Sequence, residues 1–365
     1  MIIKEIKLQN FRNYEDIEME FDNSRNIVIG ENAQGKTNLI EAVYLCAFAK
    51  SFRTNNAAEL VRFNEDIGRV NVLIESEDIE KSINIAINNK GKKMISKDGK
   101  VIRATTELLN NLVVIIFSPE DLRIIKDDPE RRRSFLNKEI SQIRPRYYEQ
   151  LRKYNEALKQ KNAILKADNR RFDESILDIY DQQLAAAGYE VIRYRREFTE
   201  KLSHRAAEIQ GAISDNRENL TIRYKETISP SNSEDMYNEI VMDRDKDIYN
   251  GHAGRGPHRD DLVFYINEKD AKKYGSQGLQ RTIALSLKLA EVKLAQDILD
   301  EAPILLLDDV LSELDIERQR FLINEIDDVQ LFITSTEVNE EIMERMRNGS
   351  VYKVQNGNIV QIERR

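Results

Sequence analysis

The chain has 365 residues, of which 33% are charged and 41% hydrophobic, a composition typical of soluble globular proteins with two or three domains. No apolar run approaches the roughly 20 residues that a membrane span requires, so we expect a cytoplasmic protein without a membrane partner. The single cysteine, Cys46, excludes a disulfide framework within the chain. Three histidines are too scattered to build a metal centre: His204, His252 and His258.

The first 120 residues are expected to be rich in strands. Alternating or short apolar runs bounded by turn residues predict five strands: 3–11, 17–21, 26–29, 70–75 and 83–87. A helix is predicted from Gly35 to about Phe48, directly after the third of these strands. The continuous apolar run 112–117 is typical of a central strand.

Residues 121–239 are predicted to form an all-helical inserted lobe. Asp128 followed by Pro129 is typical of a helix start. Apolar residues at steps of three and four over 147–165 and 180–198 predict a short antiparallel helical hairpin, joined through residues 168–171.

After about residue 240, strands and helices alternate again. We expect a strand, a long amphipathic helix, two buried strands and a hairpin that turns at Asn356-Gly357, in this order: 262–266, 278–299, 304–307, 331–333 and 350–362. The sequence therefore predicts a discontinuous α/β lobe formed by residues 1–120 and 240–365, which carries the helical insertion.

The strongest motif is a glycine-rich segment between a predicted strand and helix, Gly30-Glu31-Asn32-Ala33-Gln34-Gly35-Lys36-Thr37. It matches G-x-x-x-x-G-K-[ST], whose backbone N–H groups cradle phosphates at a helix N-terminus. Lys36 would neutralise the β- and γ-phosphates of ATP, and the Thr37 hydroxyl would bind Mg²⁺. The alternative is a chance glycine-rich turn, which the flanking strand and helix argue against.

A second motif is the buried strand over 304–307, which ends in the carboxylates of Asp308 and Asp309. Such a pair beside a phosphate site suits a hydrated Mg²⁺ and an attacking water. We assign Asp308 to the metal shell and Asp309 to polarising the water, so Lys36, Asp308 and Asp309 are the predicted catalytic residues. An ordinary strand followed by a solvated turn is the alternative.

Two further segments complete an ordered set. Ser276-Gln277-Gly278-Leu279-Gln280-Arg281 precedes the long predicted helix, and Ser312-Glu313-Leu314-Asp315 follows the two carboxylates. The first segment alone is weak evidence, and a plain helix cap explains it better. Its place roughly 30 residues before the acidic strand makes it informative.

In this order, the motifs resemble the ABC-type ATPase heads of chromosome-maintenance proteins. Four segments narrow the resemblance to the RecF family of bacterial recombination and gap-repair proteins, over nearly the whole chain: IKLQNFRNY (6–14), FSPEDL (117–122), GPHRDD (256–261) and SQGLQRT (276–282). The implied fold is a P-loop ABC-type ATPase head with an inserted lobe.

The resemblance implies a homodimer that forms on ATP binding and clamps DNA at single-strand gaps. Ser276 and Gly278 of one subunit would meet the γ-phosphate held by the other, and Asp315 would lie at the seam. Arg12 would reach the phosphates from its own subunit, unless it is only a surface arginine at a strand end. RecR and RecO are the implied partners, in recombinational repair, replication and the SOS response.

The sequence departs from transporter ATPases at three positions. Their usual Gln and His sensors of the γ-phosphate are absent. The stretch in place of the His is Ile333-Thr334-Ser335-Thr336-Glu337, so a hydroxyl would have to sense the γ-phosphate. Asp309 stands where a longer Glu is usual. We therefore expect a weak, DNA-linked ATPase whose slow hydrolysis times a switch.

Charge is unevenly distributed, although the net charge of −8 argues weakly against nucleic-acid binding. Residues 131–171 carry 13 basic and 4 acidic side chains, while residues 297–328 carry 11 acidic and 2 basic ones. Either run could be a solvated helix face. Five basic residues predict a stripe that contacts DNA phosphates on duplex or single strands without reading sequence: Arg131, Arg132, Arg133, Arg146 and Lys153. Because three consecutive arginines cannot share one helix face, at least one should pair with a nearby acid.

Other functions fit less of the sequence. A structural chromosome-maintenance head, in which ATP only controls dimerisation, would need longer coiled-coil arms than this insertion provides. A transporter ATPase should carry the missing Gln and His, and a small-molecule kinase would not need Ser276 or the loop at Asp315. His258 and Arg259, in a proline-containing turn, fit a structural corner better than a nucleotide contact.

Overall fold

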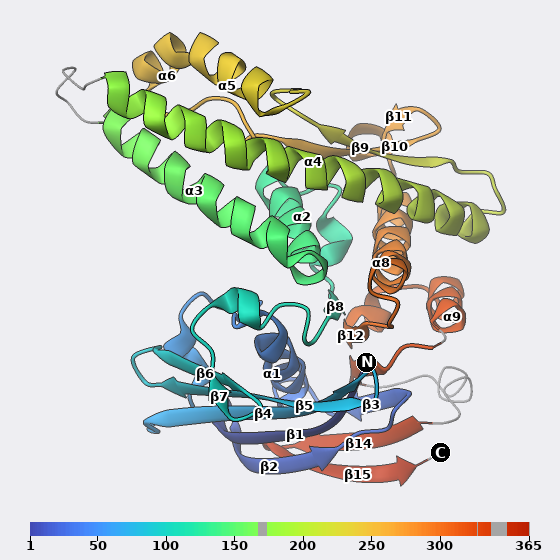
Figure 1. The fold of residues 1–365 in the computed structure, drawn as a ribbon. Coiled ribbons are helices and arrows are strands. Elements are labelled where there is room, and N and C mark those ends of the chain that lie inside the picture. Colours follow the sequence, from blue (N-terminus) through green and yellow to red (C-terminus); the bar gives the residue numbers. More distant parts are fainter. Residues whose placement is uncertain (167–173, 327, 337–348, 365) are drawn as a thin grey trace. The chain divides into compact units, whose positions relative to one another are not determined.

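The computed structural model describes residues 1–166, 174–326, 328–336 and 349–364, and the chain divides into two compact units (Figure 1). Unit 1 comprises Met1–Arg123 and Arg281–Arg365, so it contains both ends of the chain. Unit 2 comprises Ile124–Gln280 and is inserted between them. Unit 1, like the α/β lobe expected from the sequence, is formed by segments from both ends of the chain.

One sheet of unit 1 is antiparallel throughout, with strand order β2-β1-β4-β5-β6-β7. In β4, buried and more exposed residues alternate, because one face of the sheet covers the core and the other faces solvent. The six strands are β1 (Ile2–Phe11), β2 (Tyr14–Glu20), β4 (Ile67–Ser76), β5 (Ile79–Asn88), β6 (Lys93–Lys97) and β7 (Lys100–Val101).

The second sheet of unit 1 has the order β15-β14-β3-β13-β12-β8 and is parallel except for the last hairpin. Its strands are β3 (Arg25–Ile29), β8 (Val114–Phe117), β12 (Ile304–Asp308), β13 (Leu331–Ser335), β14 (Gly349–Gln355) and β15 (Asn358–Arg364). The prediction of a central strand over 112–117 was wrong, because β8 lies at the edge of this sheet. All four residues of β8 are buried, so the apolar run indicates that the strand is buried and not that it lies at the centre of the sheet.

Among the residues that the structure describes, three helices belong wholly or mainly to unit 1: α1 (Lys36–Phe48), α8 (Gln277–Leu299) and α9 (Ile316–Glu325). Almost every residue of α1 is buried. A single apolar cluster joins α1 to residues of both sheets, including Ile6, Val72, Leu306 and Phe332. This two-sided packing fixes the N-terminus of α1 at the carboxyl end of β3.

Unit 2 contains helices and a small antiparallel sheet of order β11-β10-β9, so the prediction of an all-helical lobe was incomplete. The expected boundary at residue 239/240 also differs from the observed one at 280/281, because β10 pairs with β9 along its whole length. The elements are α2 (Pro129–Ile143), α3 (Pro145–Lys166), α4 (Glu174–Ile213), β9 (Leu220–Lys225), α5 (Ser233–Met242), α6 (Arg244–Asn250), β10 (Asp261–Ile266), β11 (Lys269–Asp270) and α7 (Ala271–Tyr274).

Helices α3 and α4 pack as an antiparallel hairpin. The rings of Tyr147 and Tyr194 meet edge to face at 5.9 Å. At Gly188 a Cβ atom would lie 3.0 Å from the Tyr154 ring, so glycine permits the close approach of the two helices. The predicted connection, residues 168–171, lies outside the described residues.

Buried charges also hold unit 2 together. Lys161 Nζ, on α3, lies 2.9 Å from Asp181 Oδ1 on α4 and 2.8 Å from Asp247 Oδ2 on α6. These three residues are almost completely buried, so each charge depends on its partners for stabilisation. Within the part of the chain described here, no helix combines the length and apolarity that a membrane span requires.

Candidate functional site

The glycine-rich loop lies between β3 and α1, as its motif requires. Ala33 and Gly35 have positive φ angles of 65° and 127°, which turn successive peptide groups of the loop. A Cβ atom on Gly35 would lie 2.8 Å from the Asn13 side chain, so both the backbone angle and the available space require glycine there. The loop thus places backbone N–H groups at the N-terminus of a buried helix, where anions are favoured.

Lys36 supplies the positive charge of this loop. Its side chain is almost fully buried, and Nζ donates to the carbonyl oxygens of Gly30 at 2.8 Å and Glu31 at 3.1 Å. The ammonium group is therefore held inside the loop by backbone oxygens.

The structure brings three predicted polar groups together at the ends of β12 and β13. Thr37 Oγ1 donates to Asp308 Oδ1 at 3.0 Å, and Thr334 Oγ1 donates to the same oxygen at 2.7 Å. Burial raises the pKa of Asp308 above its ordinary value, and the neighbouring charge of Asp309 acts in the same direction. Hydrogen bonds from Thr334 and Thr37 oppose this change. The carboxylate is thus costly to ionise where it stands, and a cation beside it would be favoured.

The donor set suits Mg²⁺ held jointly with a nucleotide. Among the described residues, no group of three or more histidine, cysteine or acidic side chains could hold a metal by itself. Mg²⁺ commonly uses one or two carboxylates together with substrate phosphates and water. Thr37 and Asp308 provide one hydroxyl and one buried carboxylate next to the loop, which fits that pattern.

Asp309 follows Asp308 with a left-handed backbone, at a φ angle of 51°. Its N–H group donates to Thr334 Oγ1 at 3.0 Å, and its carbonyl oxygen accepts from Ser312 Oγ at 2.7 Å. These contacts fix the second acid beside the first and beside Thr334. The role of Asp309 in polarising water stays a prediction.

Arg12 is neither an isolated surface residue nor a free cation. Its Nε and Nη2 atoms donate to both carboxylate oxygens of fully buried Glu41 at 2.8 and 2.7 Å, and Nη1 donates to the Glu59 carbonyl oxygen at 3.0 Å. Arg53 Nη1 lies 3.6 Å from Glu41 Oε2. Glu41, on α1, thus holds two arginines. The predicted contact of Arg12 with phosphates stays a prediction.

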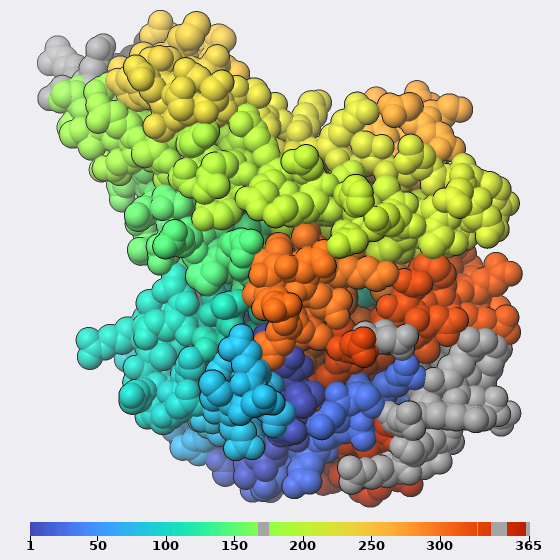
Figure 2. All heavy atoms as spheres, turned by 45° about the vertical axis from the view of Figure 1, so that its right-hand side comes forward, coloured from blue at the N-terminus to red at the C-terminus, as the bar shows by residue number. Residues whose placement is uncertain are grey.

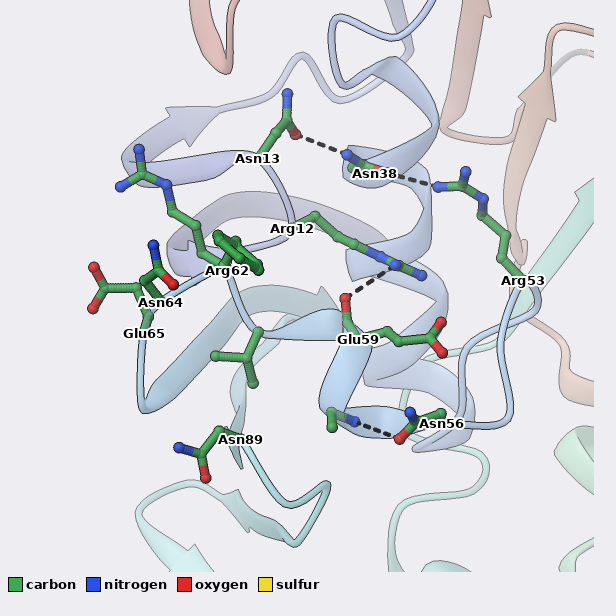
Figure 3. A pocket seen from close by; sticks show the side chains of 13 residues that line it. Arg12, Asn13, Asn38, Arg53, Asn56, Glu59, Arg62, Asn64, Glu65 and Asn89 are labelled. Atoms are coloured by element: carbon green, nitrogen blue, oxygen red, sulfur yellow. Dashed lines mark hydrogen bonds between the residues drawn. The ribbon is translucent and has the colours of Figure 1, made fainter.

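An open, polar hollow of about 720 Å³ is lined by Arg12, Asn13, Asn38 and Arg53 among others, and Figure 3 shows its side chains. A chain of hydrogen bonds runs along one wall: Asn38 donates to Asn13 at 2.8 Å, and Arg53 donates to Asn38 at 2.7 Å (Figure 3). Asn13 Nδ2 in turn donates to Gln34 O at 2.7 Å. Sequence reasoning missed Asn38 and Arg53. Asn38 lies on the helix that the motif opens, so its position could have identified it, whereas Arg53 lies in a connection without periodicity.

The Ser-x-Gly segment forms the start of α8, in unit 2. Ser276 Oγ accepts from the Leu279 N–H at 3.2 Å as a helix cap, and both Ser276 and Gly278 are exposed. Figure 2 shows orange surface, the colour of the chain near these residues, on the face turned to the viewer. Further along α8, in unit 1, Arg281 donates to Glu313 O at 2.7 Å and to Glu313 Oε2 at 2.9 Å. The helix thereby fixes the Ser312–Asp315 loop, in which Asp315 caps α9.

The predicted DNA stripe is only partly available. Arg132 must be removed from it, because its side chain is 4% exposed and donates to both oxygens of Asp261 at 2.7 and 2.9 Å. Arg133 donates to the Asp260 carbonyl oxygen, and Arg131 pairs with Asp127 at 3.3 Å. The pair of Arg131 with Asp127, four residues apart, is the local pairing expected of consecutive arginines.

Arg146 and Lys153 lie on α3 and are exposed. They are seven residues apart, which places them on one face of the helix. They are therefore the two residues of the predicted stripe that are most available to a polyanion.

His258 is half-buried and lies at a corner of unit 2. Its Nδ1 atom lies 2.6 Å from the Tyr154 hydroxyl, and Nε2 lies 3.0 Å from the Ala253 carbonyl oxygen. Burial lowers the pKa of His258 to about 4, so the ring is neutral near pH 7. The Nε2–H group then donates to Ala253 and Nδ1 accepts from Tyr154, an arrangement that holds the turn in place.

Comparisons of the sequence with known proteins identify one family. The model of the RecF/RecN/SMC N terminal domain matches residues 2–360. The chain is 40% identical over 370 residues to the DNA replication and repair protein RecF of Clostridioides difficile (strain 630), covering 100% of this chain and 99% of the relative. It is 41% identical over 361 residues to RecF of Clostridium perfringens (strain SM101 / Type A), covering 98% and 99%.

Solved structures give the same result. The recombination mediator protein RecF-ATPrS in the RecFOR pathway has a TM-score of 0.91 at 34% identity, covering 99% of this chain and 98% of that one. The corresponding RecF-ATP structure has a TM-score of 0.90 at 35% identity. The Smc head domain from Pyrococcus furiosus, at 16% identity and a TM-score of 0.58, shares the fold alone. The chain therefore belongs to the RecF family and has its ABC-type ATPase head.

Proposed function

We propose that this RecF-family protein is an ATP-binding recombination and repair protein that acts as an ATP-gated DNA clamp. The observation that carries the proposal is the 3.0 Å contact between Thr37 Oγ1 and Asp308 Oδ1, which joins the phosphate loop to the acidic strand. Relatives solved as RecF-ATP and RecF-ATPrS, over nearly the whole chain, support ATP as the nucleotide.

The phosphates of ATP would lie on the loop N–H groups, with Lys36 neutralising their charge. Thr37 and Asp308 would hold Mg²⁺, which when bound neutralises phosphate charge. The hollow lined by Asn13, Asn38 and Arg53 would receive the sugar and base, because Asn13 also donates to Gln34 O of the loop.

Hydrolysis would be weak and linked to DNA. Asp309 would polarise the attacking water, and Thr334 would hold Asp308 and the Asp309 backbone in register. Aspartate is one methylene shorter than the usual glutamate, so it reaches less far toward a water. A low turnover suits a switch that opens after a delay.

Dimerisation would follow ATP binding. Ser276 and Gly278 are exposed at the N-terminus of a long helix, where the helix dipole favours an anion. The γ-phosphate held by a second copy would supply that anion, and Asp315 would lie at the seam.

The DNA surface would contact phosphates and not bases. Arg146 and Lys153 are its exposed members, with Arg131 and Arg133 beside the start of α2. Such contacts are tolerant of sequence and sensitive to salt. We infer action at single-strand gaps in recombinational repair, replication maintenance and SOS induction, with RecR and RecO as partners, from membership of the RecF family.

Equilibrium binding of ATP in the presence of Mg²⁺, followed by turnover with and without gapped DNA, tests the proposal. The wild-type protein should bind ATP and hydrolyse it slowly, faster with DNA, and Lys36→Met should weaken binding. An ATP affinity unaffected by Lys36→Met would contradict the proposal that ATP binds to the loop at residues 30–37. Binding without any turnover, even on DNA, would favour a structural head in which ATP only controls dimerisation.

A further inference from the structure

The C-terminal hairpin of unit 1 contacts the nucleotide loop. Strand β14 pairs in parallel with β3, with Lys353 opposite Ile29, so the segments that follow the two strands leave the same edge of the sheet. The approach is close: a Cβ atom on Gly30 would lie 2.5 Å from the Val354 carbonyl oxygen. Glycine at the first position of the loop is thus required by the hairpin as well as by the phosphate motif.

Gln34 is the residue of the loop that the hairpin holds. The Asn356 N–H group donates to Gln34 Oε1 at 2.6 Å, and the Gly357 N–H group lies 3.4 Å from Gln34 O. That carbonyl oxygen also accepts from Asn13 Nδ2 at 2.7 Å. Gln34 is half-buried, whereas the three residues before it are exposed. The loop is therefore supported at Gln34 from both the β14–β15 turn and the β1–β2 turn.

The turn itself is shaped to make this contact. Asn356 and Gly357 have φ angles of 50° and 73°, as in the two-residue turns that suit β-hairpins. A Cβ atom on Gly357 would lie 2.4 Å from the Asn13 carbonyl oxygen. The turn is thus in direct contact with the β1–β2 turn, and any side chain at residue 357 would push it away from the loop.

We propose that the Asn356-Gly357 turn positions the nucleotide loop for binding. The turn holds Gln34 so that the loop is ordered before the nucleotide arrives. The loss of conformational entropy on ordering the loop therefore does not reduce the free energy of nucleotide binding. Residues 34, 356 and 357 are positioning residues that act through the loop. This inference rests on the proposed function, in which ATP binds to residues 30–37.

The chain provides a matched control for the decisive substitution. Asp98-Gly99, between β6 and β7, is a second two-residue turn, with φ angles of 48° and 74°, and a Cβ atom on Gly99 would meet nothing within 4 Å. Gly357→Ala and Gly99→Ala therefore impose similar backbone strain. Only the first also displaces a turn from the nucleotide loop.

Equilibrium binding of ATP with Mg²⁺ to the full chain is the first measurement. Gly357→Ala should raise the Kd roughly five- to tenfold, which corresponds to the loss of about one hydrogen bond, while Gly99→Ala should leave it within twofold of the wild-type value. Gln34→Met, which removes the acceptor for the Asn356 N–H group, should raise the Kd roughly two- to tenfold and provides the test if Gly357→Ala does not fold.

Amide hydrogen exchange is the second measurement, because binding coupling is reciprocal. If the docked turn favours ATP, then ATP must favour the docked turn by the same factor. Exchange of the amides at 355–358 should slow when ATP is added, and those at 97–100 should not change. A Kd equal for the two alanine variants, or no change in exchange at 355–358, would overturn this inference while ATP binding by the wild-type chain stands. Failure of the wild-type chain to bind ATP would overturn the proposed function and this inference together.

Discussion

Thr37 and Asp308 are 271 residues apart in the chain, yet the Thr37 hydroxyl donates to the Asp308 carboxylate at 3.0 Å. The contact exists because β3 and β12 flank β13 in one parallel sheet, so the segments that follow these strands leave the same edge. Thr334, on the strand between them, donates to the same carboxylate oxygen. The site is thus assembled from both ends of the chain.

The Asp308→Asn variant should be more stable than the wild-type protein without nucleotide, and it should lose Mg²⁺-dependent ATP binding. Burial raises the pKa of Asp308, so the wild-type fold loses stability as pH rises from the unfolded-state pKa through the folded-state pKa. Asparagine removes that cost and keeps an oxygen acceptor for Thr37 and Thr334. Thermal unfolding at pH 7 should show a Tm increase of roughly 2–4 °C for each kcal/mol gained. A lower Tm for Asp308→Asn, with ATP binding retained, would contradict this interpretation of the carboxylate.

The Arg12→Ala variant should destabilise unit 1 strongly. Removing Arg12 leaves fully buried Glu41 without its bidentate partner, which we expect to cost about 3 kcal/mol, the lower end of the range for a broken buried pair because Arg12 is partly exposed. Arg62→Ala is the control, because the Arg62–Glu15 pair is exposed and should be worth less than about 1 kcal/mol. Urea unfolding measures both values. Equal losses for the two variants would show that Glu41 does not depend on Arg12.

Neutralising Arg146 and Lys153 should weaken DNA binding without changing stability. Removing one ionic interaction with a phosphate should reduce the slope of log K against log salt by roughly 0.9 for duplex DNA. Lys201→Ala, which removes an exposed lysine of α4, is the control and should leave the slope unchanged. Titrations of labelled DNA at several salt concentrations give the slopes. Identical slopes for Arg146→Ala and the wild-type protein would show that Arg146 does not contact DNA.

Unit 2 should lose stability as the pH falls below about 6.5. The unfolded chain protonates His258 near its ordinary pKa of 6.5, whereas burial lowers the pKa of the folded state to about 4. The stability present above pH 6.5 is therefore lost between those values, by about 2 kcal/mol at pH 5. Denaturant unfolding from pH 8 to pH 5 measures the loss. The His258→Gln variant should show a smaller slope of the free energy of unfolding against pH. An unchanged slope in that variant would assign the pH dependence to other groups.

The nucleotide loop and the acidic strand could be predicted from sequence because local order fixes them. A strand, six loop residues and a helix follow one another directly in the chain, and the apolar composition of residues 304–307 predicts the strand before Asp308. The contact of Asp308 with Thr334 could not be read in the same way, because it depends on which strands are neighbours in the sheet. The misplaced β8 has the same cause.

For the basic segment 131–171, the sequence could not show which side chains are exposed. Composition identifies residues 131–171 but cannot separate Arg132, which pairs with Asp261 from another element, from exposed Arg146. The pairing partner lies 129 residues further along the chain, on β10, which the sequence pattern assigns to the other lobe. Long-range pairing of charges, like strand order, requires the folded structure.

Sedimentation of the protein with and without ATP tests the central claim most directly. We predict a monomer without ATP and a dimer with it, whereas Ser276→Arg should bind ATP with unchanged affinity and stay monomeric. Ser231→Arg, at another exposed serine of unit 2, should dimerise like the wild-type protein. An ATP-loaded wild-type protein that stays monomeric while it hydrolyses ATP, or a Ser276→Arg variant that dimerises normally, would contradict the account.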